Sequence, residues 1–288
     1  MKIVITGANG QLGSELQDLF NEKSNYECFF LDRNKLPLDQ TMLIQAILAQ
    51  YKPDLIIHGG AYTAVDLAES QTELADKINH LAAEQIAAYC ALHGTKLIAI
   101  STDYVFDGLS SVALKEDAPV APINTYGLTK LKGEQAIQML CPEAIIIRTS
   151  WVYSTYGKNF VKTMIRLMSE RDEIGVINDQ IGSPTYARDL AAAILVIIAS
   201  DKWLGGVYHY SNEGEISWYD FAVAIKENNG LTCIINPIPS VAYTTPAARP
   251  SFSLLDKSKI KATFGLTISE WKVSLVDMLS QYNRVTSY

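Results

Sequence analysis

The segment 1-MKIVITGANGQLGSELQDLF-20 decides the fold class of this 288-residue chain. Lys2–Thr6 is a short apolar, β-branched run, and glycines follow at Gly7, Gly10 and Gly13 before an amphipathic stretch. Glycines at this spacing permit a tight turn, close approach of the backbone to a diphosphate, and close packing of helix on strand. The N–H groups at the helix start face the anion. The segment therefore predicts a strand, turn and helix that bind a dinucleotide.

Further apolar runs recur along the first half of the chain, at residues 28–31, 54–57, 96–100 and 144–148. Helix-like segments of about ten to twenty residues separate them. This alternation is typical of parallel βαβ units. We predict an α/β fold in which residues 1–150 form a Rossmann-type, doubly wound parallel sheet that binds NAD(P).

The second half, residues 151–288, is predicted to be mainly a smaller C-terminal α/β substrate-binding lobe, with some segments returning to the first domain. Helices are expected around 159–170, 187–199 and 217–228, with short strands near 175–177 and 207–210. The proline-rich stretch 237–250 predicts an extended loop, because proline lacks a backbone donor. A last helix is expected over 269–282, with Ser269 as its N-cap.

Bulk composition excludes several classes of function. A net charge of -7 and a pI near 5.2 argue against a surface for nucleic acid or an anionic membrane. The longest apolar run, 191–199, is far short of the ~20 residues that span a bilayer. Met1 runs straight into the first strand without a secretion signal, so we expect a cytoplasmic protein.

Cysteines and histidines give no sign of a metal centre. The four cysteines lack zinc or disulfide spacing and are expected to be buried apolar residues; they are Cys28, Cys90, Cys141 and Cys233. The four histidines show no paired ligand spacing either. We therefore predict no catalytic transition metal.

The end of the second predicted strand bears on the choice of cofactor. Asp32 lies there, where its carboxylate can accept hydrogen bonds from the adenosine ribose, which favours NADH. Arg33 follows, and a guanidinium at that position can pair with the extra phosphate of NADPH. A solvated turn without a ligand is the alternative. Both NADH and NADPH stay open.

A tyrosine and a lysine are the candidate catalytic pair. The fourth predicted strand leads into 101-STDYVFDG-108, and Tyr126 and Lys130 follow at the start of a predicted helix. Residues i and i+4 lie on one helical face. The ammonium should therefore lower the phenol pKa from about 10 towards neutrality and make Tyr126 a general acid. A solvent-facing pair is the alternative, because this spacing arises often by chance.

Four motifs together resemble the dTDP-4-dehydrorhamnose reductases of the extended short-chain dehydrogenase/reductase superfamily. They are TGANGQLG (6–13), STDYVFDG (101–108), YGLTKLKGE (126–134) and RTSWVY (148–153). Segments 178–185 and 243–250 are also similar to that family. The resemblance implies reduction of dTDP-4-dehydro-L-rhamnose to dTDP-L-rhamnose by hydride from NADPH or NADH, the last step of dTDP-L-rhamnose synthesis.

The resemblance also implies roles for individual residues. Tyr126 would donate the proton, Lys130 would orient the nicotinamide ribose and tune the tyrosine, and Thr102 would hydrogen-bond the keto oxygen. The implied sugar-nucleotide contacts are Thr102, Asp103, Trp151, Asn178 and Arg249, although Trp151 is alternatively a core residue. The implied cofactor contacts are Gly10, Gln11, Leu12, Asp32, Asp39, Ala61, Tyr62 and Thr63, besides the glycine turn and the catalytic pair.

The sequence departs from the family pattern in two places. His58-Gly59-Gly60-Ala61 stands where the family usually has Asn-Ala-Ala-Ala, and we assign His58 no role. Some members bind Mg²⁺ at a dimer interface through three glutamates. Here the matching residues are Glu15, Asp189 and Gln281, so we doubt the metal and the metal-linked dimer. A homodimer stays possible.

Two alternative functions stay open at this point. One is reduction or epimerisation of another nucleotide-activated ketosugar. The other is a non-catalytic, NADP-binding regulatory subunit. The presence of Thr102, Tyr126 and Lys130 together argues against the second. A non-catalytic subunit does not need a general acid, a lysine that tunes its pKa and a donor to the keto oxygen.

Overall fold

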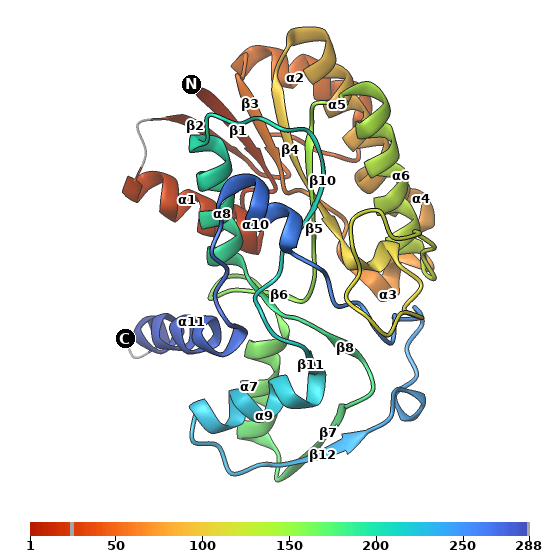
Figure 1. The fold of residues 1–288 in the computed structure, drawn as a ribbon, viewed down its shortest axis with the longest axis vertical. Coiled ribbons are helices and arrows are strands. Elements are labelled where there is room, and N and C mark those ends of the chain that lie inside the picture. The colour runs from red at the N-terminus through yellow and green to blue at the C-terminus, as the bar shows by residue number, and fades with distance from the viewer. Residues whose placement is uncertain (24–25, 287–288) are drawn as a thin grey trace.

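A six-stranded parallel sheet forms the centre of the molecule. The computed structural model describes residues 1–23 and 26–286. The strand order is β10-β5-β4-β3-β1-β2 (Figure 1). The strands are β1 (Lys2–Thr6), β2 (Glu27–Leu31), β3 (Leu55–His58), β4 (Lys96–Thr102), β5 (Ile145–Thr149) and β10 (Gly206–His209). The predicted fold class is confirmed, and the five predicted strands of the first half begin or end within two residues of the observed ones.

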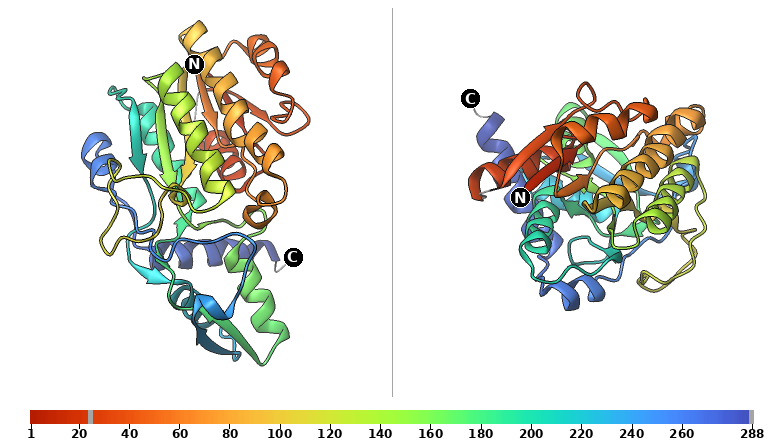
Figure 2. Two further views of the ribbon diagram at one scale, coloured as in Figure 1. Left: turned by 90° about the vertical axis from the view of Figure 1, so that its right-hand side faces the viewer. Right: turned by 90° about the horizontal axis from the view of Figure 1, so that it is seen from above.

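Helices cover both faces of this sheet (Figure 2). One face packs against α1 (Gln11–Lys23), α8 (Ala187–Ala199) and α10 (Ser258–Phe264). The other packs against α2 (Ile44–Tyr51), α5 (Ala82–His93) and α6 (Thr125–Leu140). Successive residues of a strand point to opposite faces, so Ile3 and Ile5 lie in the first core and Val4 in the second. Burying each such side chain contributes about 1.5–3 kcal/mol.

A separate hydrophobic core lies beyond the carboxyl ends of the strands, in the lower part of Figure 1. Its helices are α7 (Phe160–Glu170), α9 (Trp218–Asn228) and α11 (Trp271–Thr286). Its strand pairs are β7 (Glu173–Ile177) with β12 (Ile234–Ile238), β6 (Val152–Tyr153) with β9 (Thr185–Tyr186), and β8 (Ile181–Gly182) with β11 (Ile216–Ser217). The three helices predicted over 159–170, 187–199 and 217–228 are present as α7, α8 and α9.

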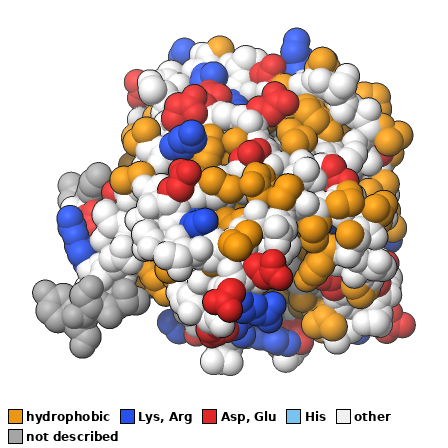
Figure 3. Space-filling model, turned by 90° about the horizontal axis from the view of Figure 1, so that it is seen from below, with side chains coloured by type: hydrophobic (Ala, Val, Ile, Leu, Met, Phe, Trp, Pro, Cys, Tyr) orange, Lys and Arg blue, Asp and Glu red, His pale blue; other side chains and the backbone are white. Residues whose placement is uncertain are grey.

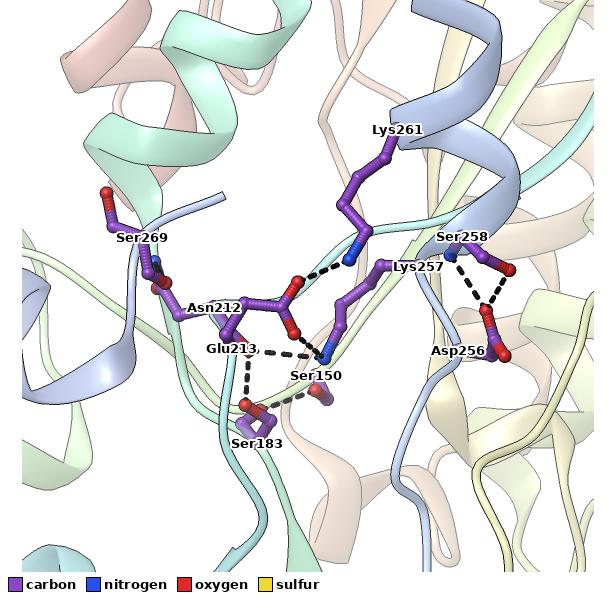
Figure 4. A network of polar contacts seen from close by, with 9 residues as sticks. All are labelled: Ser150, Ser183, Asn212, Glu213, Asp256, Lys257, Ser258, Lys261 and Ser269. Carbon is purple, nitrogen blue, oxygen red and sulfur yellow. Dashed lines mark hydrogen bonds and ion pairs between the residues drawn. The ribbon is translucent and has the colours of Figure 1, made fainter. Parts of the chain in front are cut away.

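The chain returns from this third core to the central sheet. Strand β10 pairs with β5, and a polar network fixes the segment that follows it (Figure 4). Lys257 and Lys261 both bind the carboxylate of Glu213, at 3.2 and 2.8 Å. Ser183 donates to the carbonyl of Asn212 at 2.5 Å. These contacts join α10 to the loops around the site.

Two predictions in the second half were wrong in detail. Pro237 lies in β12 opposite Val176, not in an extended loop. The missing N–H costs little there, because β12 pairs with β7 alone in a two-stranded sheet and has an unpaired edge. Helix α11 begins at Trp271, so Ser269 is not its N-cap. The Ser269 carbonyl instead accepts a hydrogen bond from the backbone N–H of Glu213 at 2.9 Å.

The remaining observations concern the surface and the cysteines. No helix in the described part of the chain is long and apolar enough to cross a membrane. Acidic and basic side chains alternate with hydrophobic ones on the face seen from below (Figure 3). Cys90, Cys141 and Cys233 are buried as predicted, whereas Cys28 is half-buried.

Candidate active site

The glycine turn between β1 and α1 has room only for glycine at two positions. Gly7 has φ of +72°, and a Cβ there would lie 2.7 Å from the backbone of Gly60. A Cβ at Gly13 would lie 2.3 Å from the carbonyl oxygen of Gly7. The Gly10 N–H donates to that same carbonyl at 2.9 Å, which closes the turn. The turn thus leaves open backbone at the start of α1, which fits the diphosphate of a dinucleotide.

The residues after the turn join it to the third core. The Gln11 amide donates to the carbonyl of Val152 at 3.2 Å and accepts from Asn159 at 2.9 Å. Leu12 packs partly buried against the core on the α1 face. These two hydrogen bonds connect the start of α1 directly to β6 and to the N-cap of α7.

Asp32 and Arg33 lie where the sequence placed them, just beyond the end of β2. The Asp32 carboxylate accepts hydrogen bonds from the backbone N–H of Asn34 and Lys35, both at 3.0 Å, and these lower its pKa. Arg33 is largely exposed and forms a 3.5 Å ion pair with Asp39. A charged carboxylate and an exposed guanidinium thus stand side by side, so the geometry leaves both NADH and NADPH open.

The predicted cofactor contacts Ala61, Tyr62 and Thr63 follow β3 and are held by a residue that sequence reasoning missed. The side chain of Asn79 accepts from the Tyr62 N–H at 2.8 Å and donates to the Tyr62 carbonyl at 3.2 Å. Its amide also donates to the Thr129 hydroxyl in α6 at 3.1 Å. Asn79 lies in a one-turn π-helix, Lys77–Leu81, a feature frequent at functional sites.

The three predicted catalytic residues come together at the carboxyl edge of the sheet. Thr102 ends β4, and its hydroxyl lies near enough to the phenol of Tyr126, in the first turn of α6, to affect the phenol pKa. Lys130 follows one turn later and donates from Nζ to the carbonyl of Ile100 at 2.8 Å. The close approach of α6 requires Gly127, because a Cβ there would lie 2.1 Å from the carbonyl oxygen of Tyr104.

The electrostatics of this pair differ from the sequence prediction. Burial raises the pKa of Tyr126 to about 12, and the neighbouring Asp103 adds to this rise. Burial lowers the pKa of Lys130 to about 8, although Glu134 opposes the change. The prediction that Lys130 brings the phenol pKa towards neutrality was wrong, because the ammonium is itself desolvated and hydrogen-bonded to the backbone.

Asp103 stands beside Thr102 and is almost fully buried. The Thr102 hydroxyl donates to its carboxylate at 3.0 Å. Burial raises the pKa of Asp103 to about 6, while the nearby hydroxyls of Ser253 and Thr102 oppose the rise. A carboxylate in this position can accept hydrogen bonds from sugar hydroxyls.

Trp151 adopts a strained backbone conformation next to the site. Its φ is +47°, a region that bulky residues rarely occupy and that costs about 1–3 kcal/mol. Its ring stacks on Trp218 at 3.7 Å between centroids, with 13° between planes, and Phe160 packs against Trp218 at 4.5 Å. Sequence analysis missed Trp218, which is the first residue of α9 and lies in no recognisable motif.

The other two predicted substrate residues are placed differently from one another. Arg249 forms an ion pair with Asp66 at 2.9 Å and lies beside Tyr104, whose ring contacts that of Tyr126. Asn178 is exposed after β7, and its backbone N–H donates to the carbonyl of Ile238 at 3.0 Å. No contact given by the described residues joins Asn178 to Thr102 or Tyr126.

Known proteins of the same fold and sequence pattern place this arrangement in a family. The family model described as "RmlD substrate binding domain" matches residues 1–284. The dTDP-4-dehydrorhamnose reductase of Aggregatibacter actinomycetemcomitans is 39% identical over 284 residues, covering 95% of this chain and 97% of that protein. This chain belongs to the dTDP-4-dehydrorhamnose reductase family.

Solved structures of the family superpose closely. The dTDP-4-dehydrorhamnose reductase of Clostridium acetobutylicum has a TM-score of 0.94 at 39% identity and covers 98% of this chain and 100% of its own. The Bacillus anthracis reductase, solved in complex with NADP, has a TM-score of 0.93 at 40% identity and covers 97% and 99%. Both likenesses extend through the central sheet and the third core.

The residues that match the family's magnesium ligands do not fit that metal in this chain. The Glu15 carboxylate is bound by Ser154 at 2.6 Å and by Arg188 at 3.5 Å. The carboxylate of Asp189 accepts from Asn212 at 2.7 Å and from Ser274 at 2.5 Å, and Gln281 donates to Asp277. Within residues 1–23 and 26–286, no group of three His, Cys, Asp or Glu side chains is arranged to hold a metal ion.

His58, the other departure from the family pattern, is a buried neutral side chain. Its Nδ1 lies 2.8 Å from the Thr6 hydroxyl, which also accepts the Gly60 N–H at 3.2 Å. Burial and the nearby Lys130 lower the pKa of His58 to about 3. The imidazole therefore supports the turn that carries the predicted cofactor contacts.

Proposed function

We propose that this chain reduces dTDP-4-dehydro-L-rhamnose to dTDP-L-rhamnose, with NADPH or NADH as the hydride donor. The observation that carries the proposal is that Thr102, Tyr126 and Lys130 come together at the carboxyl edge of the sheet that also bears the glycine turn. The names of the relatives support the same reaction, and the NADP complex of the Bacillus anthracis reductase supports the cofactor class.

The cofactor would be held by the glycine turn, Asp32 or Arg33, and the loop of Ala61–Thr63. When bound, the reduced nicotinamide supplies the hydride to the 4-keto carbon. Lys130 would orient the nicotinamide ribose, and its ammonium is charged below about pH 8. Asn79 holds the backbone of the 61–63 loop and thereby the shape of this side of the site.

The protein's part in the chemical step is proton donation and charge stabilisation. Tyr126 would donate to the keto oxygen, where negative charge develops, and the Thr102 hydroxyl would turn from Asp103 to donate to the same oxygen. Tyr126 then passes its proton to the alkoxide oxygen, which completes the alcohol. Asp103, Trp151, Asn178 and Arg249 are proposed to bind or position the sugar nucleotide.

A turnover assay with two variants tests the proposal. The purified protein is supplied with NADPH or NADH and a panel of dTDP- and GDP-linked 4-ketosugars, and cofactor oxidation is followed by absorbance. We expect turnover of the dTDP-linked ketohexose, and a loss of about 100- to 10,000-fold in kcat for Tyr126→Phe with an unchanged Kd for NADPH. Tyr51→Phe, at the end of α2, is the matched control and should retain full activity.

Other outcomes would redirect the assignment. A preference for a GDP-linked ketosugar would identify a reductase of another nucleotide sugar. Tight NADPH binding without turnover of any ketosugar would favour the regulatory subunit. Equal rates for the Tyr126→Phe variant and the unchanged protein would exclude Tyr126 as the proton donor.

A further inference from the structure

A two-point ion pair joins the short helix α3 (Val65–Ala68) to the loop that precedes Pro250. The Arg249 guanidinium donates to both carboxylate oxygens of Asp66, at 3.0 and 2.9 Å. The same carboxylate accepts from the backbone N–H of Ala247 at 3.3 Å. Asp66 therefore fixes both the side chain and the backbone of this loop, and parallel bonds of this kind set orientation as well as distance.

The ion pair continues towards the catalytic tyrosine. The Arg249 guanidinium also lies beside Tyr104, in the turn that follows Thr102, near enough for each group to affect the pKa of the other. The ring of Tyr104 meets the ring of Tyr126 edge to face, with centroids 5.7 Å apart and 80° between planes. Asp66, Arg249 and Tyr104 thus form a continuous chain of contacts that ends on Tyr126, which we call the strut.

Three of the donors of Arg249 are used within this segment. A guanidinium has five N–H donors. Two bind Asp66 and one binds the carbonyl of Ala247 at 3.0 Å. The charge of Arg249 is also balanced by Asp66. The guanidinium is therefore arranged to hold the loop that precedes Pro250 beside Tyr104.

We propose that Asp66 is a positioning residue for proton transfer, acting through Arg249 and Tyr104 to hold the phenol of Tyr126 beside Thr102. The idea rests on the proposed function for the role of Tyr126. A neighbouring contact supports it, because Asn124, the N-cap of α6, donates to the carbonyl of Ala248 at 2.7 Å. The loop and the start of α6 are thus tied together as well.

Kinetics of charge-removing variants test the strut. We expect Asp66→Asn to lower kcat about 10- to 100-fold, because a misplacement of about 1 Å has effects of this size. KM for the ketosugar and Kd for NADPH should change less than about twofold. Tyr104→Phe should lose a similar factor, and the double variant should lose no more than either single one. Glu170→Gln, which breaks the surface pair with Arg166, is the matched control and should keep full activity.

Three kinetic results would overturn the proposal. A rise in KM with an unchanged kcat in Asp66→Asn would mean that the pair acts on substrate binding instead. Fully additive losses in Asp66→Asn and Tyr104→Phe would mean that the two residues act independently. Arg249→Lys retains the positive charge but not the pair of N–H groups that binds both carboxylate oxygens of Asp66. A full kcat in that variant would equally contradict the strut.

A spectroscopic arm separates failure of the strut from failure of the proposed function. The protein is labelled with ¹³C at Cζ of tyrosine, and the Tyr126 resonance is assigned from its absence in Tyr126→Phe. We expect Asp66→Asn, but not Glu170→Gln, to shift the resonances of Tyr104 and Tyr126. If these resonances shift while the unchanged protein reduces no ketosugar, the strut is supported and the proposed function is contradicted. If the resonances do not shift, the strut is contradicted whatever the activity.

Discussion

Replacing Lys130 by methionine should abolish activity and yet stabilise the folded protein at neutral pH. The ammonium is buried, and its pKa falls from 10.5 to about 8. Each pKa unit is worth about 1.4 kcal/mol, so keeping this lysine charged costs about 3 kcal/mol of folding free energy. The variant also loses the hydrogen bond to Ile100, worth about 1.5–3 kcal/mol for a charged donor. The expected net gain is about 0–2 kcal/mol.

The pH dependence of this gain carries the sharper test. Between about pH 8 and 10.5 the unfolded chain keeps a proton on Lys130 that the folded chain has lost. Stability of the unchanged protein therefore rises with pH through this window. The cost of the buried charge is complete below about pH 8 and fades above it. The advantage of Lys130→Met should accordingly be largest at neutral pH and smaller at about pH 9.5.

Urea unfolding followed by tryptophan fluorescence measures the difference at both pH values. Lys132→Met is the matched control, because Lys132 lies on the same helix, is exposed, and pairs with Asp76 at the surface. It should change the free energy of unfolding by less than about 1 kcal/mol at either pH. A Lys130→Met protein that is less stable at neutral pH, or whose advantage is equal at both pH values, would refute the reasoning.

Three further predictions follow from the geometry. Gly13→Ala should lower the free energy of unfolding by about 1–3 kcal/mol and weaken NADPH binding, because the new Cβ would lie 2.3 Å from the Gly7 carbonyl oxygen. Thermal unfolding measures the change in stability, and cofactor titration measures the change in Kd. Asp103 becomes charged only above about pH 6, so kcat/KM should rise as the pH passes through about 6. The Asp103→Asn variant should show no such rise. If the rise persists in that variant, it comes from a different titrating group. Trp218→Ala should remove the exciton band of the stacked indoles from the circular dichroism spectrum and raise KM for the ketosugar about 2- to 10-fold, with Kd for NADPH unchanged.

The central sheet was predictable because its strands are buried on both faces. Leu55–His58 and Ile145–Thr149 are buried along their whole length, so they read as continuous apolar blocks in the sequence. The glycine turn was partly predictable for a similar reason, since a Cβ at Gly13 would meet Gly7 and Ala8 within the same short segment, whereas the obstacle at Gly7 is the distant backbone of Gly60. Local sequence carries the information wherever the constraint is itself local.

The parts that the sequence did not reveal depend on contacts between distant segments. Asp66 meets Arg249 across 183 positions, and neither residue carries a motif that names the other. Trp218 becomes notable only because Trp151 stacks on it. Pro237 was mistaken for loop because an unpaired strand edge tolerates proline, and the partner strand of that edge is not visible in the local pattern.

The raised pKa of Tyr126 suits the proposed direction of the reaction. A general acid must be protonated at working pH, and a phenol with a pKa of about 12 is fully protonated near neutrality. The group that receives the proton is an alkoxide, a far stronger base than a phenolate, so transfer is downhill even from a weakened acid. Lowering the phenol pKa matters more for oxidation of the alcohol, where tyrosinate must accept the proton. The half-buried Tyr126 is therefore already in the protonated form that reduction of the ketone requires.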